Sequence, residues 1–515
     1  MMLRLEAFVL KKLTRRIATR GQNILCRAGL EKDPAKVLFV DDDRSVSYGD
    51  FQKWIGKCVA TLFKKYAINK GDRVLCRTTK SLDAVALYMA CLQIGAIYVP
   101  VNPSYTLHET KHFVEDCSPK LMVTCTEEKD SALHELISNI VNENKFYAES
   151  KSATTELDVE NVENDHVACI CYTSGTTGLP KGVMLTHGSL STNAEALVHT
   201  WRFTRDDKLL HMLPFYHVHG MFISLNCSLF SHSTVIWRER FSIEDCLRWL
   251  PSTTVMMGVP TYYSRLLSSP GFNRQLLSQL RLFTCGSAPL STPLWVDFKS
   301  RTGHSILERY GMTEAQVICS NPYDDRRPGS VGKPIADTKL RINQEGVIEI
   351  KSSSLFAGYW NNPEKTANDF TMDKYFITGD LGSVDEDAYF EENSSFSCFL
   401  HILGRKKDLI ITGGFNVYPK EVEDCIDHLP DVEESAIIGV PHKDLGEVVV
   451  AVVNSKSLAN EKGSEQAIIS ALKKVLVEYK IPRRVIFVPS LPRNSMAKIQ
   501  KNVLREQLRD LFDEK

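Results

Sequence analysis

A stretch of hydroxyl-bearing residues and glycines, closed by one lysine, has the composition of a phosphate-binding loop. It spans residues 172–182 and follows a short apolar run at 167–171, which predicts a buried strand. Its glycines and its proline oppose regular structure. Backbone N–H groups, hydroxyls and a single ammonium together suit a polyphosphate. The residues predicted to contact phosphate are Thr173, Ser174, Gly175, Thr176, Thr177, Gly178 and Lys181.

This stretch is not a Walker A loop, in which Gly-Lys is followed directly by Ser or Thr. Here Lys181 follows Pro180 and precedes Gly182. The alternative is a surface linker rich in Ser, Thr and Gly. Linkers seldom lie between a buried strand and a helix of apolar periodicity, which is predicted here over residues 188–201. The pattern therefore favours a phosphate loop.

Two later segments carry carboxylates that suit a nucleotide site. Residues 306–314 read Ile-Leu-Glu-Arg-Tyr-Gly-Met-Thr-Glu, in which Tyr310 could stack on adenine and Thr313 could contact phosphate. Alone, Glu314 would be a solvated acid, but beside the other motifs it is a candidate Mg²⁺ ligand. Mg²⁺ accepts one or two carboxylates together with phosphate oxygens. Asp380 ends a predicted strand, and one carboxylate can accept hydrogen bonds from both ribose hydroxyls.

Two further motifs predict walls of the same site. Residues 213–220 read Leu-Pro-Phe-Tyr-His-Val-His-Gly, and the two histidines lack a nearby third metal ligand. We therefore expect His217 in a site without metal, with a polar turn as the alternative. Residues 282–290 predict a strand, a glycine turn and the start of a helix. Backbone at such a turn can lie flat against a planar base, here at Gly286, Ser287 and Ala288.

Strands and helices alternate along the part of the chain that must position these residues. Ser47 is predicted to cap a helix that runs to about residue 66, and a second helix is expected over 81–94. Strands are expected at 73–75, 96–100 and 121–123. This pattern predicts an α/β fold with mostly parallel, layered sheets and catalytic loops at the carboxyl ends of strands.

The character of the chain changes after residue 403. Segments 436–440 and 448–453 are rich in β-forming residues, and 465–479 is predicted to be helical. Pro419 is expected in the first turn of a helix. About a hundred residues of this kind form a plausible separate α+β domain.

Bulk properties exclude several classes of protein. The 515 residues predict two to four domains, and a formal net charge of −1 gives no field that would recruit nucleic acid. The 14 cysteines show no metal-type pairs. No apolar run is long enough to span a bilayer, and no secretory signal is found, so a reducing compartment is expected.

The N-terminus is basic and amphipathic. Arginines and lysines outnumber acids, and apolar residues are interleaved at near-helical spacing. This pattern predicts a mitochondrial transit peptide over residues 1–30 and a location in the mitochondrial matrix. The alternative is a basic surface helix of the mature protein.

As a set, these motifs resemble the signature blocks of the adenylate-forming superfamily. This superfamily includes acyl-CoA synthetases, luciferases and the adenylation domains of peptide synthetases, and the likeness runs from about residue 36 to the end. Its members make an acyl-adenylate from a carboxylic acid and ATP, then pass the acyl group to a thiol or another acceptor. The resemblance implies a large multi-layered N-terminal domain at 31–403 and a small mobile α+β domain at 404–515.

The resemblance also implies roles for individual residues. Thr176 and Glu314 become catalytic residues and Mg²⁺ ligands, and Lys498 becomes the catalytic lysine that bridges ATP and the acid carboxylate. His217 would lie beside that carboxylate. For ATP, the resemblance implies the phosphate loop described above, a phosphate contact at Thr313, ribose clamps at Asp380 and Arg405, and an adenine wall formed by Gly286, Ser287, Ala288 and Tyr310. For the second step, it implies a hinge at Lys407 and contacts of Gly413 and Gly414 with the pantetheine arm of CoA.

Within the superfamily, the likeness is greatest to malonyl-CoA synthetases, in phrases such as residues 213–220, 258–267 and 307–314. A second substrate carboxylate in a pocket needs a cation, and a guanidinium fork suits it. Arg265 lies beside the predicted acyl pocket and matches the malonate-binding arginine of that group. The alternative is a helix arginine that extends to solvent.

Two features depart from the superfamily pattern. Ala497 replaces the glycine that is usual before the catalytic lysine, and alanine adopts positive φ only at a cost. Residues 391–400 look inserted just before the hinge. A hairpin loop, a lineage-specific feature and a gene-model error are the alternatives for this segment.

We therefore expect ATP-dependent ligation of malonate, or of methylmalonate, to coenzyme A through an acyl-adenylate. The expected small molecules are ATP, Mg²⁺, CoA and the acid, and no oligomeric state is predicted. One alternative is a ligase for a short- or medium-chain monocarboxylic acid. Another is a decayed nucleotide- or CoA-binding protein, which would release no pyrophosphate. A carrier-protein adenylation module and a luciferase-type oxygenase fit less well.

Overall fold

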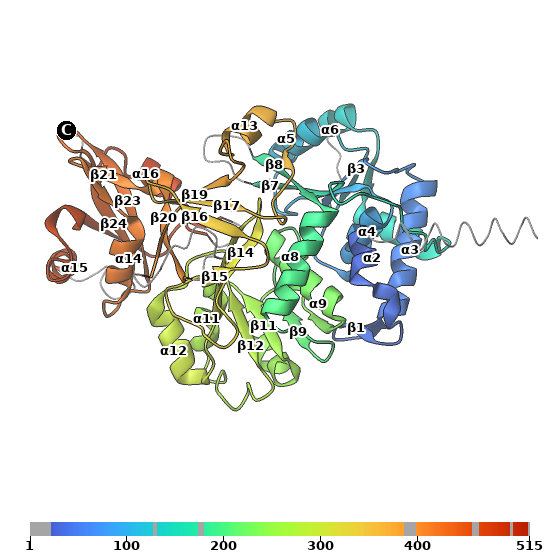
Figure 1. Ribbon diagram of the computed structural model, residues 1–515, viewed down its shortest axis with the longest axis horizontal. Helices are drawn as coiled ribbons and strands as arrows, with labels where there is room; N and C mark the ends of the chain where they lie inside the picture. The colour runs from blue at the N-terminus through green and yellow to red at the C-terminus, as the bar shows by residue number, and fades with distance from the viewer. Residues whose placement is uncertain are drawn as a thin grey trace, which may run out of the picture.

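The computed structural model of the protein is shown in Figure 1. It describes residues 22–126, 131–173, 180–385, 398–455, 463–494 and 498–512, apart from the side chains at 107, 108, 131 and 132. Four sheets organise these residues. Two of them are large and mainly parallel, so the predicted α/β class is confirmed.

The largest sheet has nine strands in the order β15-β14-β13-β12-β11-β9-β10-β1-β2. The central run from β13 to β1 is parallel, and both edges are antiparallel. Its strands are β1 Val37–Val40, β2 Ser45–Ser47, β9 Lys208–His211, β10 Thr234–Trp237, β11 Val255–Gly258, β12 Leu282–Cys285, β13 Leu307–Met312, β14 Gln316–Ser320 and β15 Lys333–Pro334.

The second sheet has seven strands in the order β18-β8-β7-β4-β3-β5-β6. Strands β7, β4, β3, β5 and β6 are parallel, whereas β7–β8 and β8–β18 are antiparallel. Its strands are β3 Arg73–Arg77, β4 Ile97–Pro100, β5 Leu121–Thr124, β6 Ile140–Asn142, β7 Val167–Thr173, β8 Lys181–Thr186 and β18 Gly358–Tyr359. The β7–β8 pair is the hairpin that carries the predicted phosphate loop.

Two smaller sheets follow in the chain. A four-stranded antiparallel sheet contains β16 Lys339–Ile342, β17 Val347–Lys351, β19 Phe376–Val384 and β20 Leu400–Arg405. A five-stranded sheet contains β21 Ile410–Thr412, β22 Phe415–Val417, β23 Glu434–His442, β24 Gly446–Asn454 and β25 Arg484–Val488. Figure 1 shows this last sheet gathered with α14–α16 at one end of the molecule, beside β19 and β20.

Helices cover the sheets and supply much of the core. The α-helices are α2 Ile24–Ala28, α3 Tyr48–Lys64, α4 Leu82–Gln93, α5 Leu107–Cys117, α6 Ser131–Leu136, α7 Glu143–Ser152, α8 His187–Thr200, α9 Leu225–Ser231, α10 Ile243–Trp249, α11 Pro260–Leu267, α12 Thr292–Thr302, α13 Pro363–Asn368, α14 Pro419–Asp427, α15 Ser464–Leu472 and α16 Lys501–Gln507. A π-helical segment, η2 His219–Ser224, precedes α9, and short 3₁₀ turns are η1 Leu30–Lys32, η3 Leu250–Ser252, η4 Lys406–Asp408 and η6 Glu478–Lys480.

Local sequence explains where several helices begin. The Ser47 side chain accepts a hydrogen bond from the backbone N–H of Asp50 and caps α3, as predicted. Ser81 caps α4 in the same way. Pro260 and Pro419 stand in the first turns of α11 and α14, where a missing N–H costs nothing. The helix predicted over 465–479 is shorter, since α15 ends at Leu472.

The N-terminal boundary predicted at residue 30 disagrees with the packing. Ile24, Leu25, Ala28 and Leu30 are buried in the largest apolar cluster, and the α2 residue Arg27 forms an ion pair with Glu195 of α8 at 2.7 Å. A leader cleaved after residue 30 would remove these core side chains. Residues 1–21 lie outside the described residues.

Two boundaries near the hinge also differ from the prediction. The division at residues 403 and 404 falls inside β20, which ends at Arg405 and pairs with β19. The change to the C-terminal sheet therefore comes after Arg405. Residues 391–397 lie outside the described residues, but Phe399 and Leu400 are 3% and 0% exposed. These two residues belong to the core rather than to an inserted loop.

No helix in the part of the chain that the structure describes is long and apolar enough to cross a bilayer.

Candidate active site

The mouth of the phosphate hairpin lies next to a carboxylate from the other large sheet. Thr173 and Lys181 are paired where β7 and β8 meet. The Lys181 ammonium lies 5.4 Å from the centroid of the Tyr359 ring. Burial and then Lys365 lower the pKa of Lys181, while the carboxylates of Asp369 and Glu314 oppose this shift. The predicted contacts at Ser174, Gly175, Thr176, Thr177 and Gly178 lie outside the described residues.

Glu314 is a buried acid in the turn that also contains Thr313, between β13 and β14. Its Oε1 accepts a hydrogen bond of 3.1 Å from the Tyr359 hydroxyl. Burial raises the pKa of Glu314. Within the described ranges, no group of three His, Cys, Asp or Glu side chains could hold a metal ion. One carboxylate still fits Mg²⁺, because this ion takes its other ligands from phosphate and water.

The predicted ribose clamps are adjacent. Asp380 and Arg405 face each other in the register of β19 and β20, and Arg405 Nε lies 3.3 Å from Asp380 Oδ1. The charge of Asp380 raises the pKa of Arg405. The hydroxyl of Tyr310 donates to Asp380 Oδ2 at 2.6 Å. This bond ties the predicted adenine residue to the predicted ribose residue.

The predicted adenine wall follows β12 as a tight bend. A Cβ atom on Gly286 would overlap the guanidinium of Arg309, so only glycine leaves room for this arginine. Ser287 has a φ of 71°, and its Oγ lies 3.2 Å from Nδ1 of His219. Ala288 continues the bend. The wall therefore contacts a polar cluster behind it.

That cluster consists of His217, which we expected in the site, and of His219 and Arg309, which are the main residues that sequence reasoning missed. His219 and Arg309 are 3% and 4% exposed. Nε2 of both histidines and Nε and Nη2 of Arg309 are buried and have no hydrogen-bond partner in the described part of the chain. Buried polar atoms are normally paired, so this arrangement points to a ligand with acceptor oxygens. Two adjacent charges, Glu308 and Arg309, inside a buried strand were the available signal.

Burial shapes the protonation of the polar cluster. It lowers the pKa of His217 to about 3, helped by the charge of Lys498, and it lowers the pKa of Arg309 to about 10. The pKa of His219 is also well below its ordinary value because of burial and then Arg309. Near neutral pH the histidines are therefore uncharged and Arg309 is the cation of the cluster.

Lys498 reaches the same place from the C-terminal domain. Its backbone N–H donates to Asn494 Oδ1 at 3.0 Å, and its carbonyl accepts from the Asn494 N–H at 3.0 Å, which closes a narrow loop. Burial lowers its pKa to about 8, with Arg405 and Arg309 acting in the same direction and Asp380 and Glu314 opposing. Lys498 thus lies among residues from two sheets, the nine-stranded sheet and the four-stranded sheet. Ala497 is outside the described residues.

Arg265 is not the buried cation that we expected. It is exposed on α11, whose residues Tyr263, Leu266 and Leu267 face the core. The helical period turns position 265 outward. No ion pair joins Arg265 to any residue that the structure describes. Burial raises the pKa of Tyr262 to about 12, and the charge of Arg265 opposes that shift. Arg265 therefore lies near Tyr262, at the rim of the site.

The predicted hinge and CoA residues lie outside the cluster. Lys407 is exposed in η4. Its pKa is lowered, first by partial burial and then by the charges of Arg405 and Arg505, while Asp408 and Asp380 oppose this shift. Gly413 and Gly414 form the turn between β21 and β22 with φ of 55° and 84°, and both are exposed. These glycines are available on the surface of the C-terminal domain.

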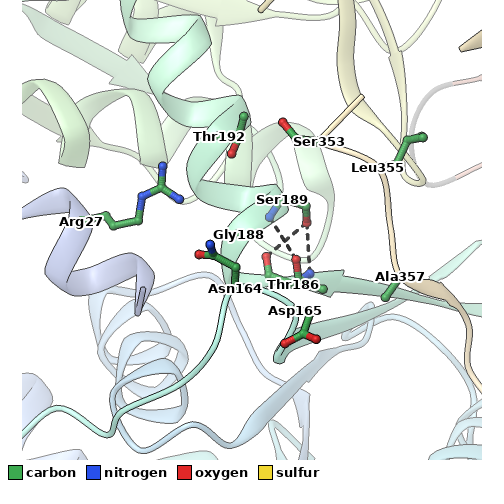
Figure 2. A pocket seen from close by; sticks show the side chains of 10 residues that line it. All are labelled: Arg27, Asn164, Asp165, Thr186, Gly188, Ser189, Thr192, Ser353, Leu355 and Ala357. Atoms are coloured by element: carbon green, nitrogen blue, oxygen red, sulfur yellow. Dashed lines mark hydrogen bonds between the residues drawn. The ribbon is translucent and has the colours of Figure 1, made fainter. Parts of the chain in front are cut away.

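A separate cavity of about 330 Å³ lies at the start of α8, at the end of β8 away from Lys181 (Figure 2). There the side chains of Thr186 and Ser189 each accept a backbone N–H of the other, and Arg27 is paired with Glu195. None of the predicted site residues lines this cavity. The described buried atoms without a hydrogen-bond partner include those of His217, His219 and Arg309 but none of the residues that line this cavity, so we place the candidate active site at the cluster around Lys498.

Comparison with known proteins identifies the family. The model of the AMP-binding enzyme matches residues 26–360, and that of the AMP-binding enzyme C-terminal domain matches residues 421–498. The chain therefore belongs to the AMP-binding enzyme family, which confirms the resemblance to adenylate-forming enzymes.

Two curated relatives and one solved protein illustrate the likeness. Malonate–CoA ligase of Arabidopsis thaliana is 33% identical over 518 residues, which cover 92% of this chain and 82% of that protein. The mitochondrial malonate–CoA ligase ACSF3 of Mus musculus is 32% identical over 492 residues, which cover 85% of this chain and 82% of that protein. ATP-bound MatB of Rhodopseudomonas palustris has a TM-score of 0.90 at 40% identity, covering 96% of this chain and 100% of that chain. The apo form of MatB has a TM-score of 0.79 at the same identity and coverage.

Proposed function

We propose that this protein is an AMP-forming ligase that joins malonate, or its 2-methyl derivative, to coenzyme A. The observation that supports a dicarboxylate is the buried guanidinium of Arg309, whose Nε and Nη2 have no hydrogen-bond partner among the described residues and which shares its cluster with two neutral histidines. A monocarboxylic acid would leave this charge unpaired at a high cost in free energy. The malonate–CoA ligases among the relatives support the same substrate.

In the first step, one malonate carboxylate attacks the α-phosphorus of ATP, the bond to the leaving phosphate breaks, and pyrophosphate departs. Lys498 stabilises the charge that develops between the carboxylate and the phosphate, and Lys181 with Thr173 holds the phosphate tail. His217, uncharged near neutral pH, borders the reacting carboxylate. Arg309 pairs with the distal carboxylate. Asp380 and Arg405 hold the ribose, beside Tyr310 and the bend at residues 286–288.

Mg²⁺ is proposed as the metal that accompanies ATP, with Glu314 as its protein ligand and Thr176 as a second. When bound, the ion neutralises phosphate charge. The buried carboxylate of Glu314, next to Lys181 at the mouth of the phosphate hairpin, suits that role because Mg²⁺ prefers hard oxygen ligands.

In the second step, the CoA thiol attacks the carbonyl carbon of malonyl-adenylate, the bond from that carbon to the phosphate oxygen breaks, and AMP leaves. We propose that the C-terminal domain, residues 406–515, first turns about Lys407. This motion withdraws Lys498 and presents Gly413 and Gly414 to the pantetheine arm. Such hinges are a few residues at element ends that absorb large backbone changes.

The test measures acid- and CoA-dependent AMP formation with malonate, methylmalonate, acetate and octanoate. We expect Arg309→Met to lower kcat/KM for malonate by about 100-fold, because a buried charge pair is worth about 2–5 kcal/mol, and to affect acetate much less. Arg265→Ala removes the rim cation and should cost about tenfold or less for malonate, since exposed pairs are weak.

Different results would lead to different assignments. If Arg309→Met keeps the preference for malonate while Arg265→Ala removes it, the rim arginine is the anchor. Preference of the natural protein for acetate or octanoate would retain the ligase chemistry and reject the dicarboxylate. No pyrophosphate release with any acid would support a binding protein without turnover.

We also propose that the protein works in the mitochondrial matrix, with a leader confined to residues 1–21. The basic, amphipathic character of this segment and the mitochondrial relative from Mus musculus support the proposal. Fusing residues 1–23 to a fluorescent protein should direct it to mitochondria, and replacing Arg15, Arg16 and Arg20 by glutamine should abolish import. Cytosolic fluorescence of the natural fusion would reject this location.

A further inference from the structure

One short segment, residues 354–360, joins the two sheets that carry the phosphate-binding groups. The backbone N–H of Phe356 donates to the carbonyl of Glu314 at 2.8 Å. Two residues later the segment becomes β18, which pairs with β8, and Trp360 N–H donates to the Gly182 carbonyl at 2.7 Å. The segment therefore holds the Glu314 turn and the phosphate hairpin at a fixed separation.

The side chain of Tyr359 completes this connection. It is 5% exposed, its hydroxyl donates to Glu314 Oε1 at 3.1 Å, and its ring centroid lies 5.4 Å from the Lys181 ammonium. Among the residues whose positions are described, no other side chain donates a hydrogen bond to the Glu314 carboxylate. One phenol thus contacts both the acid and the lysine that we assign to the nucleotide.

The chemistry of the phenol suits this place. Burial, followed by the charges of Glu314 and Asp369, raises the pKa of Tyr359 far above its ordinary value, so it stays protonated and can only donate to the carboxylate. A cation over the face of the ring gains electrostatic attraction. The adjacent aromatic residues Phe356, Phe370 and Phe376 pack without a hydroxyl, so packing alone does not require tyrosine.

We propose that Tyr359 is a positioning residue for the metal–nucleotide complex. Its hydroxyl fixes Glu314 in the rotamer that receives Mg²⁺, and its ring sets the position of Lys181 at the base of the phosphate loop. The role rests on the proposed function, because it concerns binding of ATP with Mg²⁺, but it requires neither malonate nor CoA. Tyr359 contacts neither reacting atom, so it acts through Glu314 and Lys181.

The experiment compares ATP binding by calorimetry in excess Mg²⁺ and in EDTA, with no acid or CoA present. We expect Tyr359→Phe, which removes only the hydroxyl, to weaken ATP binding about tenfold in Mg²⁺ and by less than about twofold in EDTA, because hydrogen bonds to charged groups are strong. Tyr359→Leu also removes the ring beneath Lys181, so it should weaken binding under both conditions. In turnover assays, Tyr359→Phe should raise the Mg²⁺ activation constant more than it lowers kcat.

Tyr66→Phe is the matched control, since Tyr66, just after α3, also donates to a carboxylate, Glu149 Oε2 on α7 at 2.8 Å, and neither residue is among the proposed site residues. It should leave both affinities unchanged, and thermal melting will show whether each variant is folded. Equal loss of affinity with and without Mg²⁺ in Tyr359→Phe, or no loss at all, would reject the positioning role. If the natural protein binds no ATP in either condition, the proposed function fails first.

Discussion

Lys498 is the residue on which we propose that the first chemical step depends most. Its ammonium lies among Arg405, Asp380, Arg309 and Glu314, and burial lowers its pKa to about 8. The charged form is the one that can stabilise phosphate. As the pH rises through about 8, the free enzyme loses this charge well before an ordinary lysine would.

We therefore predict that kcat/KM for ATP in malonate-dependent pyrophosphate release falls as the pH rises through about 8. The pH dependence of kcat/KM reports the pKa values of the free enzyme, in which no bound phosphate raises the pKa of Lys498. Lys498→Arg should be slower but should keep its activity to higher pH, because arginine stays protonated. Rates measured from about pH 6 to about pH 10 test this. If kcat/KM for ATP in Lys498→Arg falls at the same alkaline pH as in the natural protein, the group that titrates is not Lys498.

At the scale of elements, the site depends on bends that follow strands. β12 ends at Cys285, and the next residue has no side chain, which leaves space for the guanidinium of β13. Arg309 of the neighbouring parallel strand β13 thus fits beside β12 only because residue 286 is glycine. We propose that this close approach couples the adenine wall to the acid pocket through one backbone position.

Gly286→Ala tests that coupling. The added Cβ would overlap the Arg309 guanidinium, so the arginine must move, and such overpacking also costs about 1–3 kcal/mol of stability. We expect kcat/KM for malonate to fall at least about tenfold, with a smaller change for acetate. Gly271→Ala is the control, because the nearest atom to its Cβ would be in the flexible side chain of Leu247, at 3.3 Å. If Gly286→Ala instead raises KM for ATP equally with every acid, Gly286 contributes to adenine binding and not to the acid pocket.

At the scale of the whole molecule, the C-terminal domain is docked on the N-terminal domain with Lys498, and not Gly413 and Gly414, at the interface. Lys498 of the C-terminal domain is inserted among N-terminal residues, whereas Gly413 and Gly414 are exposed. The higher TM-score with ATP-bound MatB than with apo MatB agrees with an arrangement suited to the first step. We propose that CoA meets a different arrangement, which the chain reaches by rotation about residues 406–408.

Lys407→Pro should separate the two steps. Proline fixes φ and would hinder the backbone rotation. We predict that malonate-dependent pyrophosphate release in a single turnover stays within about threefold of the natural protein, while CoA-dependent AMP formation falls about 100-fold, because the second step needs the rotation. Lys407→Ala keeps backbone freedom and should lose far less. Equal losses in both variants would make the side chain, rather than the rotation, responsible.

The sequence alone determined the local parts of this protein. Strand and helix positions follow from apolar periodicity and caps, as at Ser47 and Pro419, because these signals act within a few residues. The residue types of Lys181, Glu314 and Asp380 also indicated the chemistry that we propose for them, although Asp380 lies within β19 and not at the end of a strand as predicted. Their ordered motifs sufficed to identify the family.

Only the tertiary structure decided which of these groups meet. Arg309 turned inward and Arg265 outward, because strand register and helix face set their directions after packing. Tyr359 reached Glu314 across 45 residues of chain, through pairing between two sheets. Lys498 entered the site only when a second domain docked. Such contacts depend on non-local packing, and no short stretch of sequence encodes them.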